Sequence, residues 1–268
     1  MNGVTEPNGG FHYRAGAAAL GGQMARPFTE PLEVQAAAFL PPSGGYGSAR
    51  RVDYRFHEIV SFRAGYTQVI GTTHQRQDQN KMITVHETLA SAVVEGLNIL
   101  DMITADRIMA RLASEYPPPP DGGGQFRMLP LGSYFVNLRI AGLLLGGAGG
   151  HLTPNKDLLK YDTMKTIEEH CGARHEAAGH RTGSSGSPKR LRLPLFDFGV
   201  NNELQAVGAK DKSSGLRIEI PSFGTIILGE YIVAEDHRQL TMVRVELHSP
   251  EAGTIDVASV EGNGTPPY

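Results

Sequence analysis

Alternating apolar and polar positions recur along the chain and predict β-strands rather than long helices. Within residues 51–62, Val52, Tyr54 and Phe56 alternate with charged side chains. A period of two over this length predicts one half-buried strand. Shorter strand candidates lie at residues 33–40, 66–72 and 133–145. Residues 74–80 carry only polar side chains and predict a loop.

The segment 82–116 allows two interpretations. Its Ala, Leu, Met and Arg residues are good helix formers. Its many β-branched residues and the turn-like Glu95-Gly96 and Asn98 favour strands instead. From Thr104 onward, apolar and charged positions alternate. We therefore predict strands here, with a break near Gly96, and no continuous helix.

The C-terminal third has the clearest strand pattern. Four apolar runs are separated by short turns, which is typical of an antiparallel meander. They span residues 216–220, 223–235, 239–248 and 253–260. The second run is apolar on both faces, as expected of a central strand that is covered on both sides.

These patterns predict an all-β fold, an antiparallel β-sandwich or jelly-roll-like domain. Its 33 Gly and 17 Pro residues favour many turns. Residues 1–30 are glycine-rich and predict a flexible arm, so 31–268 would form one β domain. A composition shift predicts a partly helical insertion at about 146–215, with its helix near 155–171. A β-solenoid is the alternative fold, although no fixed repeat of the expected length is present.

Charge and cysteine content narrow the classes of function. The net charge is −3 with 20% charged residues, and this near-balance argues against nucleic acid as a partner. The chain contains one cysteine, so it forms no internal disulfide. No apolar run reaches the length of a membrane-spanning segment.

Three segments resemble the choice-of-anchor P group of bacterial surface proteins. They are the "GLNIL…ITAD" run of residues 96–106, the "GTIILGE" run of residues 224–230 and the "VAS" run that begins at Val257. The resemblance extends over about half of the chain. It implies an extracellular or cell-surface β-rich protein without catalytic residues. The N-terminal residues lack the pattern of a secretion signal, so a cytoplasmic location is the alternative.

One cluster has the residue types of a zinc site. It contains His170, Cys171, His175, Glu176 and His180. Four such donors can close a tetrahedral site. However, the two histidines of HEAAGH are five residues apart, which does not match the HExxH metalloprotease motif. A solvated helix end and loop is the more economical interpretation, and no other cofactor is expected.

No other constellation indicates catalysis. Ser222 and Ser259 lack the GxSxG context of a nucleophile elbow, and the adjacent Asp236-His237 pair fits a polar hairpin turn. Asp101 and Asp106 are candidate calcium ligands, but an exposed turn position and a solvent-facing strand position are the better explanation for them.

The sequence therefore favours a non-enzymatic structural or surface assembly protein that associates through β-strand edges, as a homo-oligomer or with a partner protein. A module that binds a partner protein or a glycan is the first alternative. The absence of Trp makes glycan stacking a weaker case. A zinc-dependent enzyme that uses the His170–His180 cluster is the second alternative.

Overall fold

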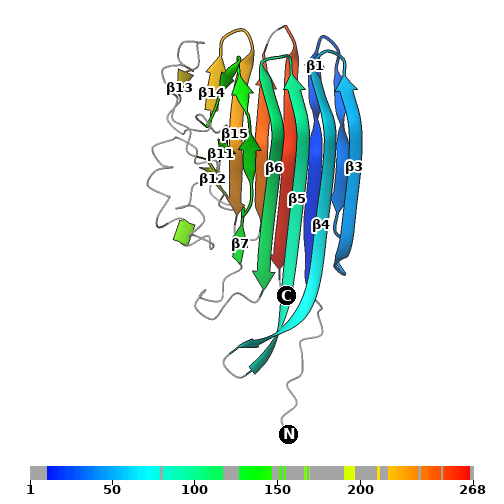
Figure 1. Ribbon diagram of the computed structural model, residues 1–268. Coiled ribbons are helices and arrows are strands. Elements are labelled where there is room, and N and C mark those ends of the chain that lie inside the picture. Colours follow the sequence, from blue (N-terminus) through cyan, green and yellow to red (C-terminus); the bar gives the residue numbers. More distant parts are fainter. Residues whose placement is uncertain are drawn as a thin grey trace, which may run out of the picture.

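Two antiparallel β-sheets pack face to face in the computed structural model (Figure 1). The structure describes residues 11–78, 81–116, 127–146, 151–152, 154, 166–167, 169, 190–196, 210–211, 217–234, 237–248 and 250–265. The predicted antiparallel β-sandwich is confirmed. The solenoid alternative is wrong, because the described strand pairs are antiparallel rather than stacked as parallel coils.

The first sheet, sheet A, joins both ends of the chain. Within the described residues its order is β13-β14-β15-β16-β17-β1-β2, and β12 also pairs with β15. Its strands are β1 (His12–Arg26), β2 (Glu30–Phe39), β12 (Arg190–Pro194), β13 (Lys210–Asp211), β14 (Arg217–Ile220), β15 (Gly224–Ala234), β16 (Arg238–Leu247) and β17 (Ala252–Thr265).

The second sheet, sheet B, is built around long hairpins. Within the described residues its order is β10-β9-β6-β5-β4-β3, while β7 and β8 also pair with β6, and β11 pairs with β8. Its strands are β3 (Gly45–Phe56), β4 (Val60–Asp78), β5 (Lys81–Ile99), β6 (Ile103–Tyr116), β7 (Arg127–Leu129), β8 (Tyr134–Val136), β9 (Arg139–Ile140), β10 (Leu143–Leu144) and β11 (His151–Leu152).

Strands β5 and β6 confirm that residues 82–116 are not helical. The break lies at residues 100–102 rather than near Gly96. Leu100 and Asp101 have φ angles of 50° and 52°, and the Asn98 side chain donates a hydrogen bond of 2.6 Å to Asp101 Oδ1. Short polar side chains that bond to their own turn are effective at such positions, so Asn98 and Asp101 end the strand pairing.

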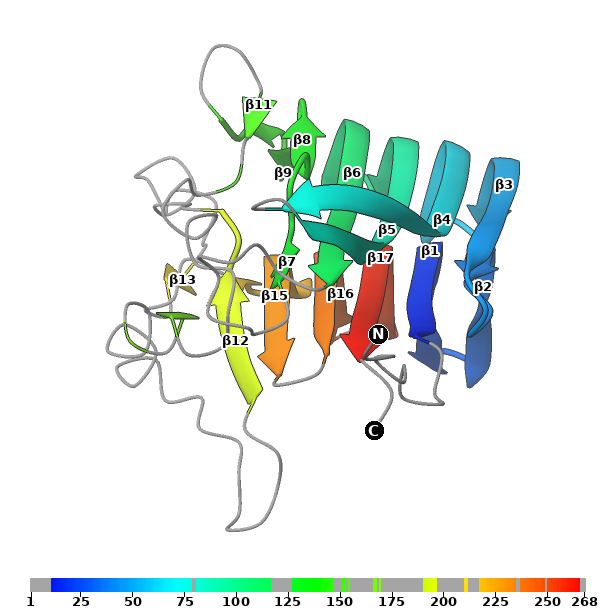
Figure 2. The ribbon, with the colours of Figure 1, turned by 90° about the horizontal axis from the view of Figure 1, so that it is seen from below.

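The predicted loop at residues 74–80 is wrong for residues 74–78, while residues 79–80 lie outside the described residues. Strands β4 and β5 stay paired as far as Asp78 and Lys81. The end of this hairpin extends past the ends of β6 and β7 (Figures 1 and 2). Polar side chains suit a ribbon that protrudes in this way, so hydropathy alone does not distinguish the ribbon from a loop.

The predicted flexible arm at residues 1–30 is wrong for His12–Arg26. This segment is β1, which lies between β17 and β2 in sheet A. Ala15, Ala17 and Ala19 are buried on its inner face. These side chains are too small to produce a strong alternating pattern, which explains why the glycine-rich composition suggested a flexible segment.

Residues 51–62 form two strands rather than one. Strand β3 ends at Phe56, and β4 begins at Val60. Asp53 has a φ of 50°, and this left-handed residue changes which face the side chains occupy. As a result Tyr54 is buried, whereas Val52 is 48% exposed. The predicted common face of Val52 and Tyr54 is therefore wrong.

Strand β15 confirms the prediction of a central strand covered on both sides, since nearly every residue in it is buried.

Part of the predicted insertion at 146–215 lies in the core rather than at the periphery. Ile167, Leu193, Leu195 and Phe196 are at most 1% exposed. The Phe196 ring lies 5.0 Å from that of Phe135, which belongs to sheet B. These residues therefore close one side of the sandwich, and the prediction of a purely decorating insertion is wrong for them. Most of the predicted helix at 155–171 lies outside the described residues.

Candidate interaction surface and outer-face pocket

The two sides of the sandwich differ in how they end. On the side of β15 and β6, Phe135 and Phe196 pack together between the sheets. On the opposite side, the edge strands β2 and β3 lie next to each other (Figure 2). Within the described residues, β2 pairs only with β1, and β3 pairs only with β4. This second side therefore presents two unpaired strand edges.

Exposed apolar side chains concentrate at these two edges. Among the described residues seven large apolar side chains are exposed, and five of them lie between positions 28 and 52. We call this set the edge surface: Phe28 (71% exposed), Val34 (58%), Phe39 (68%), Tyr46 (63%) and Val52 (48%). Phe39 lies over Gly16 on the outer face of sheet A, whereas Tyr46 pairs with Ile70 on the outer face of sheet B, so these side chains border the two edges from both faces of the sandwich. Exposed apolar side chains that gather in one region are a mark of an interaction site.

Strand β2 is held firmly although it lies at an edge. A Cβ atom on Gly16 would lie 3.2 Å from Phe39 Cδ1, so the Phe39 ring packs directly over the β1 backbone. On the inner side, Thr67 Oγ1 of β4 donates a 2.9 Å hydrogen bond to the Ala36 carbonyl. These contacts anchor β2 to β1 and to the facing strand β4.

Charged residues of both signs flank the edge surface. Strand β3 carries Arg50, Arg51 and Arg55, whereas β2 carries Glu30 and Glu33. Burial is the main reason that the pKa of the nearby Tyr54 hydroxyl is raised. Arg51 lowers this pKa, whereas Glu33 and Glu30 raise it. The acidic and basic groups thus lie close enough to influence the same buried phenol.

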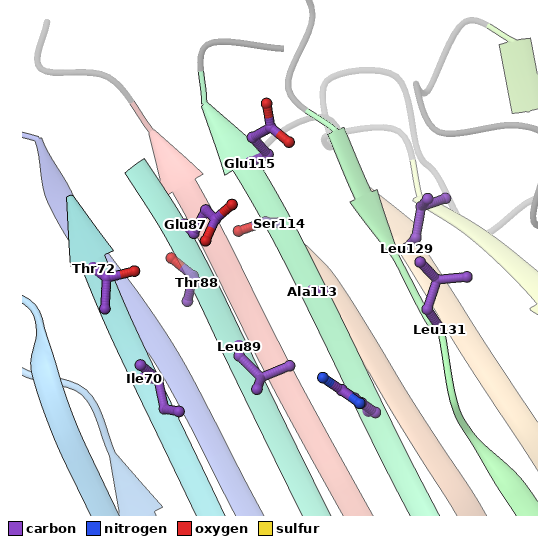
Figure 3. A pocket seen from close by; sticks show the side chains of 11 residues that line it. Ile70, Thr72, Glu87, Thr88, Leu89, Ala113, Ser114, Glu115, Leu129 and Leu131 are labelled. Atoms are coloured by element: carbon purple, nitrogen blue, oxygen red, sulfur yellow. The ribbon is translucent and has the colours of Figure 1, made fainter. Parts of the chain in front are cut away.

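A pocket of about 460 Å³ lies on sheet B (Figure 3). A row of apolar residues at matched positions on four adjacent strands lines it: Ile70, Leu89 and Ala113 form its floor, and Leu129 forms part of its wall. These positions lie on the outer face of the sheet, because the residues next to them, such as Val69, Ala90 and Leu112, belong to the core between the sheets. An apolar row across four strands is unusual on an outer face, which is normally solvated and polar.

Polar rows border this apolar floor on both sides. Toward one end of the strands, Thr72, Glu87 and Glu115 are paired across β4, β5 and β6. On the other side of the floor, Arg111 lines the pocket. Figure 3 shows Glu87 and Glu115 above Leu89 and Ala113, with Leu129 and Leu131 forming the wall. The pocket therefore has an acidic end and a basic end.

The wall at Leu131 depends on Ser133. The Ser133 hydroxyl accepts a 2.9 Å hydrogen bond from the Arg111 amide and donates one of 3.2 Å to the Arg111 carbonyl. In the gap between β7 and β8, this one side chain therefore replaces the backbone pairing with β6. The chain can then leave the edge of β6 at residues 130–133 and place Leu131, 44% exposed, at the pocket.

The predicted zinc ligands His170, Cys171, His175, Glu176 and His180 lie outside the described residues. Among the residues that are described, no group of three or more His, Cys, Asp or Glu side chains is arranged to hold a metal ion. The zinc site therefore stays a prediction.

Asp101 and Asp106 serve local hydrogen bonds. Asp101 bonds to Asn98 in the turn, and Asp106 Oδ2 accepts a 2.6 Å hydrogen bond from Asn137. His237 Nε2 lies 3.9 Å from a carboxylate oxygen of Glu261. In the described part of the chain, no helix is long and apolar enough to cross a membrane.

Local sequence patterns indicate neither of these two surfaces. The edge surface depends on which strands end the sheets, and this is not visible in local hydropathy. The pocket had a faint signal, since Leu89 interrupts the polar positions around Glu87 in a strand whose other face is also apolar. A search for apolar residues on both faces of one strand end would have found it.

A search of curated proteins and one of solved structures return no match to this chain. One family model matches residues 11–185. The match includes β1 and β2 and all of sheet B, whereas β12 to β17 lie beyond it. Because this match covers well over half of the chain, the protein belongs to the family described as "Domain of unknown function (DUF8256)".

Proposed function

We propose that this protein is a non-enzymatic assembly component that associates with a second copy of itself through the edge surface of β2 and β3. One observation carries the proposal: most of the exposed large apolar side chains among the described residues lie on or beside two strands whose outer edges are unpaired. Unpaired strand edges accept a further strand by backbone hydrogen bonding, and apolar side chains add burial to that contact.

Charge complementarity favours one arrangement of the two copies. If β3 met β3 of the second copy, Arg50, Arg51 and Arg55 would face their own counterparts. A two-fold axis beside the edge surface instead places β3 of each copy against β2 of the other, which carries Glu30 and Glu33. Such an interface is self-complementary and closes as a dimer.

The resemblance to choice-of-anchor P proteins supports placing this assembly at the cell surface or outside the cell. A stable interface of this kind should bury more than about 1,000 Å². Because backbone hydrogen bonds and apolar burial contribute most of its stability, association should depend only weakly on salt.

Sedimentation velocity over a concentration series tests the proposal. The full chain is expected to form dimers or larger species. The double variant Phe39→Ser, Tyr46→Ser should shift the equilibrium toward monomer, since both side chains are more than 60% exposed in the single chain. Far-UV circular dichroism and thermal melting then establish whether the variant keeps the folded sandwich.

Met82→Gln is the matched control, because Met82 is 65% exposed but lies at the start of β5, away from the edge surface. This variant should associate like the unmodified chain. A full-length protein that stays monomeric at every concentration contradicts the proposal, and so does equal weakening by the Met82 and the edge variants.

A further inference from the structure

The pocket on the outer face of sheet B has an apolar centre between two opposite charges. Ile70, Leu89 and Ala113 form its floor, and Leu129 and Leu131 form its wall. Its volume of about 460 Å³ lies within the range of about 300–1,000 Å³ that small-molecule sites occupy. We propose that this pocket binds a short apolar peptide in its zwitterionic form, with the ammonium group at Glu87 and the carboxylate at Arg111.

The acidic end has one carboxylate that is committed to another group and one that is available. Glu115 forms an ion pair with Arg76 near the end of the β4–β5 hairpin. Glu87 lies directly opposite Glu115 in the strand register. Like charges at such positions destabilise a sheet, so a cation at Glu87 is favoured. Its ion-pair partner among the described residues is His74, whose Nδ1 lies 3.9 Å away, and both side chains are about half exposed.

The basic end is equally available. Among the described residues no carboxylate forms an ion pair with Arg111, and its hydrogen bonds outside the strand ladder join its backbone to Ser133. The Arg111 side chain lies against Gly132, since a Cβ atom there would be 3.4 Å from Arg111 Cδ. A guanidinium group held in this way presents a fork of donors that suits a carboxylate.

The length of the pocket sets the size of the ligand. Arg111 and Glu115 are four residues apart on β6, which corresponds to about 13 Å along a strand. An extended tripeptide spans about 10 Å, and the Arg and Glu side chains cover the rest. A simple fatty acid fits less well, because its apolar tail would end against Glu87 and Glu115. A peptide with free ends matches both charges and places its central side chain over Leu89 and Ala113.

Isothermal titration calorimetry of the full chain with alanyl-leucyl-alanine tests this proposal. Acetylating the peptide N-terminus, or amidating its C-terminus, should each weaken binding by at least about tenfold, because each removes one charge-assisted contact. Glu87→Gln should weaken binding of the uncapped peptide. In this variant acetylation should cause no further loss of affinity, whereas amidation should still lower the affinity. Arg111→Gln should do the reverse, and Arg111→Lys should retain part of the binding.

Arg63→Gln is the matched protein control, because Arg63 is 71% exposed and pairs with Glu95 outside the pocket. It should bind the peptide like the unmodified chain. The proposal is overturned if no heat is detected at millimolar peptide. It is also overturned if both caps act equally in all variants, or if decanoate binds more tightly than the peptide and is indifferent to Glu87→Gln. Circular dichroism identifies any variant that has lost its fold, and the two capped peptides on the unmodified chain then decide the question.

Discussion

Nη1 of Arg244 lies 2.7 Å from Oε2 of Glu230, a carboxylate that is 3% exposed. Arg192 approaches the other oxygen of Glu230 at 3.2 Å, and Asp256 accepts hydrogen bonds of 2.7 and 3.2 Å from Arg244. Burial disfavours the charge of Arg244, but Asp256 and then Glu230 and Glu246 outweigh this effect and raise its pKa. The network links β12, β15, β16 and β17, and thus joins part of the insertion to sheet A.

Removing the charge of Glu230 should therefore destabilise the fold strongly. Glu230→Gln leaves Arg192 and part of Arg244 without a counter-charge, and breaking a buried pair in this way costs about 3 kcal/mol or more. Urea denaturation measures the loss. Glu58→Gln is the control, since its pair with Arg55 is largely exposed and should contribute less than about 1 kcal/mol. Similar losses in both variants would show that burial of the network does not matter.

Two buried threonines on adjacent strands should respond oppositely to the same substitution. Within the described residues, Thr88 Oγ1 is buried without a hydrogen-bond partner, whereas Thr67 Oγ1 donates to the Ala36 carbonyl. Thr88→Val removes an unsatisfied hydroxyl and should raise stability by up to about 1 kcal/mol. Thr67→Val should lower it by about 1–2 kcal/mol. Thermal melting of both variants gives the signs, and a loss of stability in Thr88→Val would mean that its hydroxyl is satisfied in solution.

Gly229 should not tolerate a side chain. Its φ is 61°, and a Cβ atom there would collide with the Phe196 ring. Gly229→Ala therefore adds steric conflict in the core to backbone strain, and should cost more than about 2 kcal/mol. Gly142→Ala has a comparable φ of 82° with nothing within 4 Å, and should cost only about 1 kcal/mol. Equal losses in chemical denaturation would show that Phe196 moves aside freely.

The stability of the fold should fall as the solution becomes acidic, partly because of His86. Burial lowers the pKa of His86 below its ordinary value of about 6.5. Its ring stacks on Phe11 at 4.3 Å, and Nδ1 lies 3.0 Å from Thr73 Oγ1 and 3.1 Å from the Tyr13 hydroxyl. Because the folded state favours the neutral imidazole, this contribution is complete above about pH 6.5 and is lost as pH falls through the lowered pKa.

His86→Phe keeps an aromatic ring against Phe11 but cannot take up a proton. The Tm difference between pH 7.5 and pH 5 should therefore be smaller in this variant than in the unmodified chain. His12→Phe, at an exposed position of β1, is the matched control and should leave the difference unchanged. A His86→Phe variant with the full pH dependence would assign that dependence to other groups.

Local sequence determined the all-β class, the strand character of residues 82–116 and the buried central strand β15. These features depend on the alternation of side chains between two faces, which neighbouring residues alone specify. Tertiary structure decided the place of β1, because it pairs with β17, which lies more than 200 residues away in the register, and its inner-face Ala side chains are buried between the two sheets. It also decided which edges are left unpaired, where the insertion enters the core, and how Arg111 and Glu87 come to border one pocket. Each of these depends on partners that are distant in the chain, and their identity is set by the packing of the whole sandwich rather than by any local pattern.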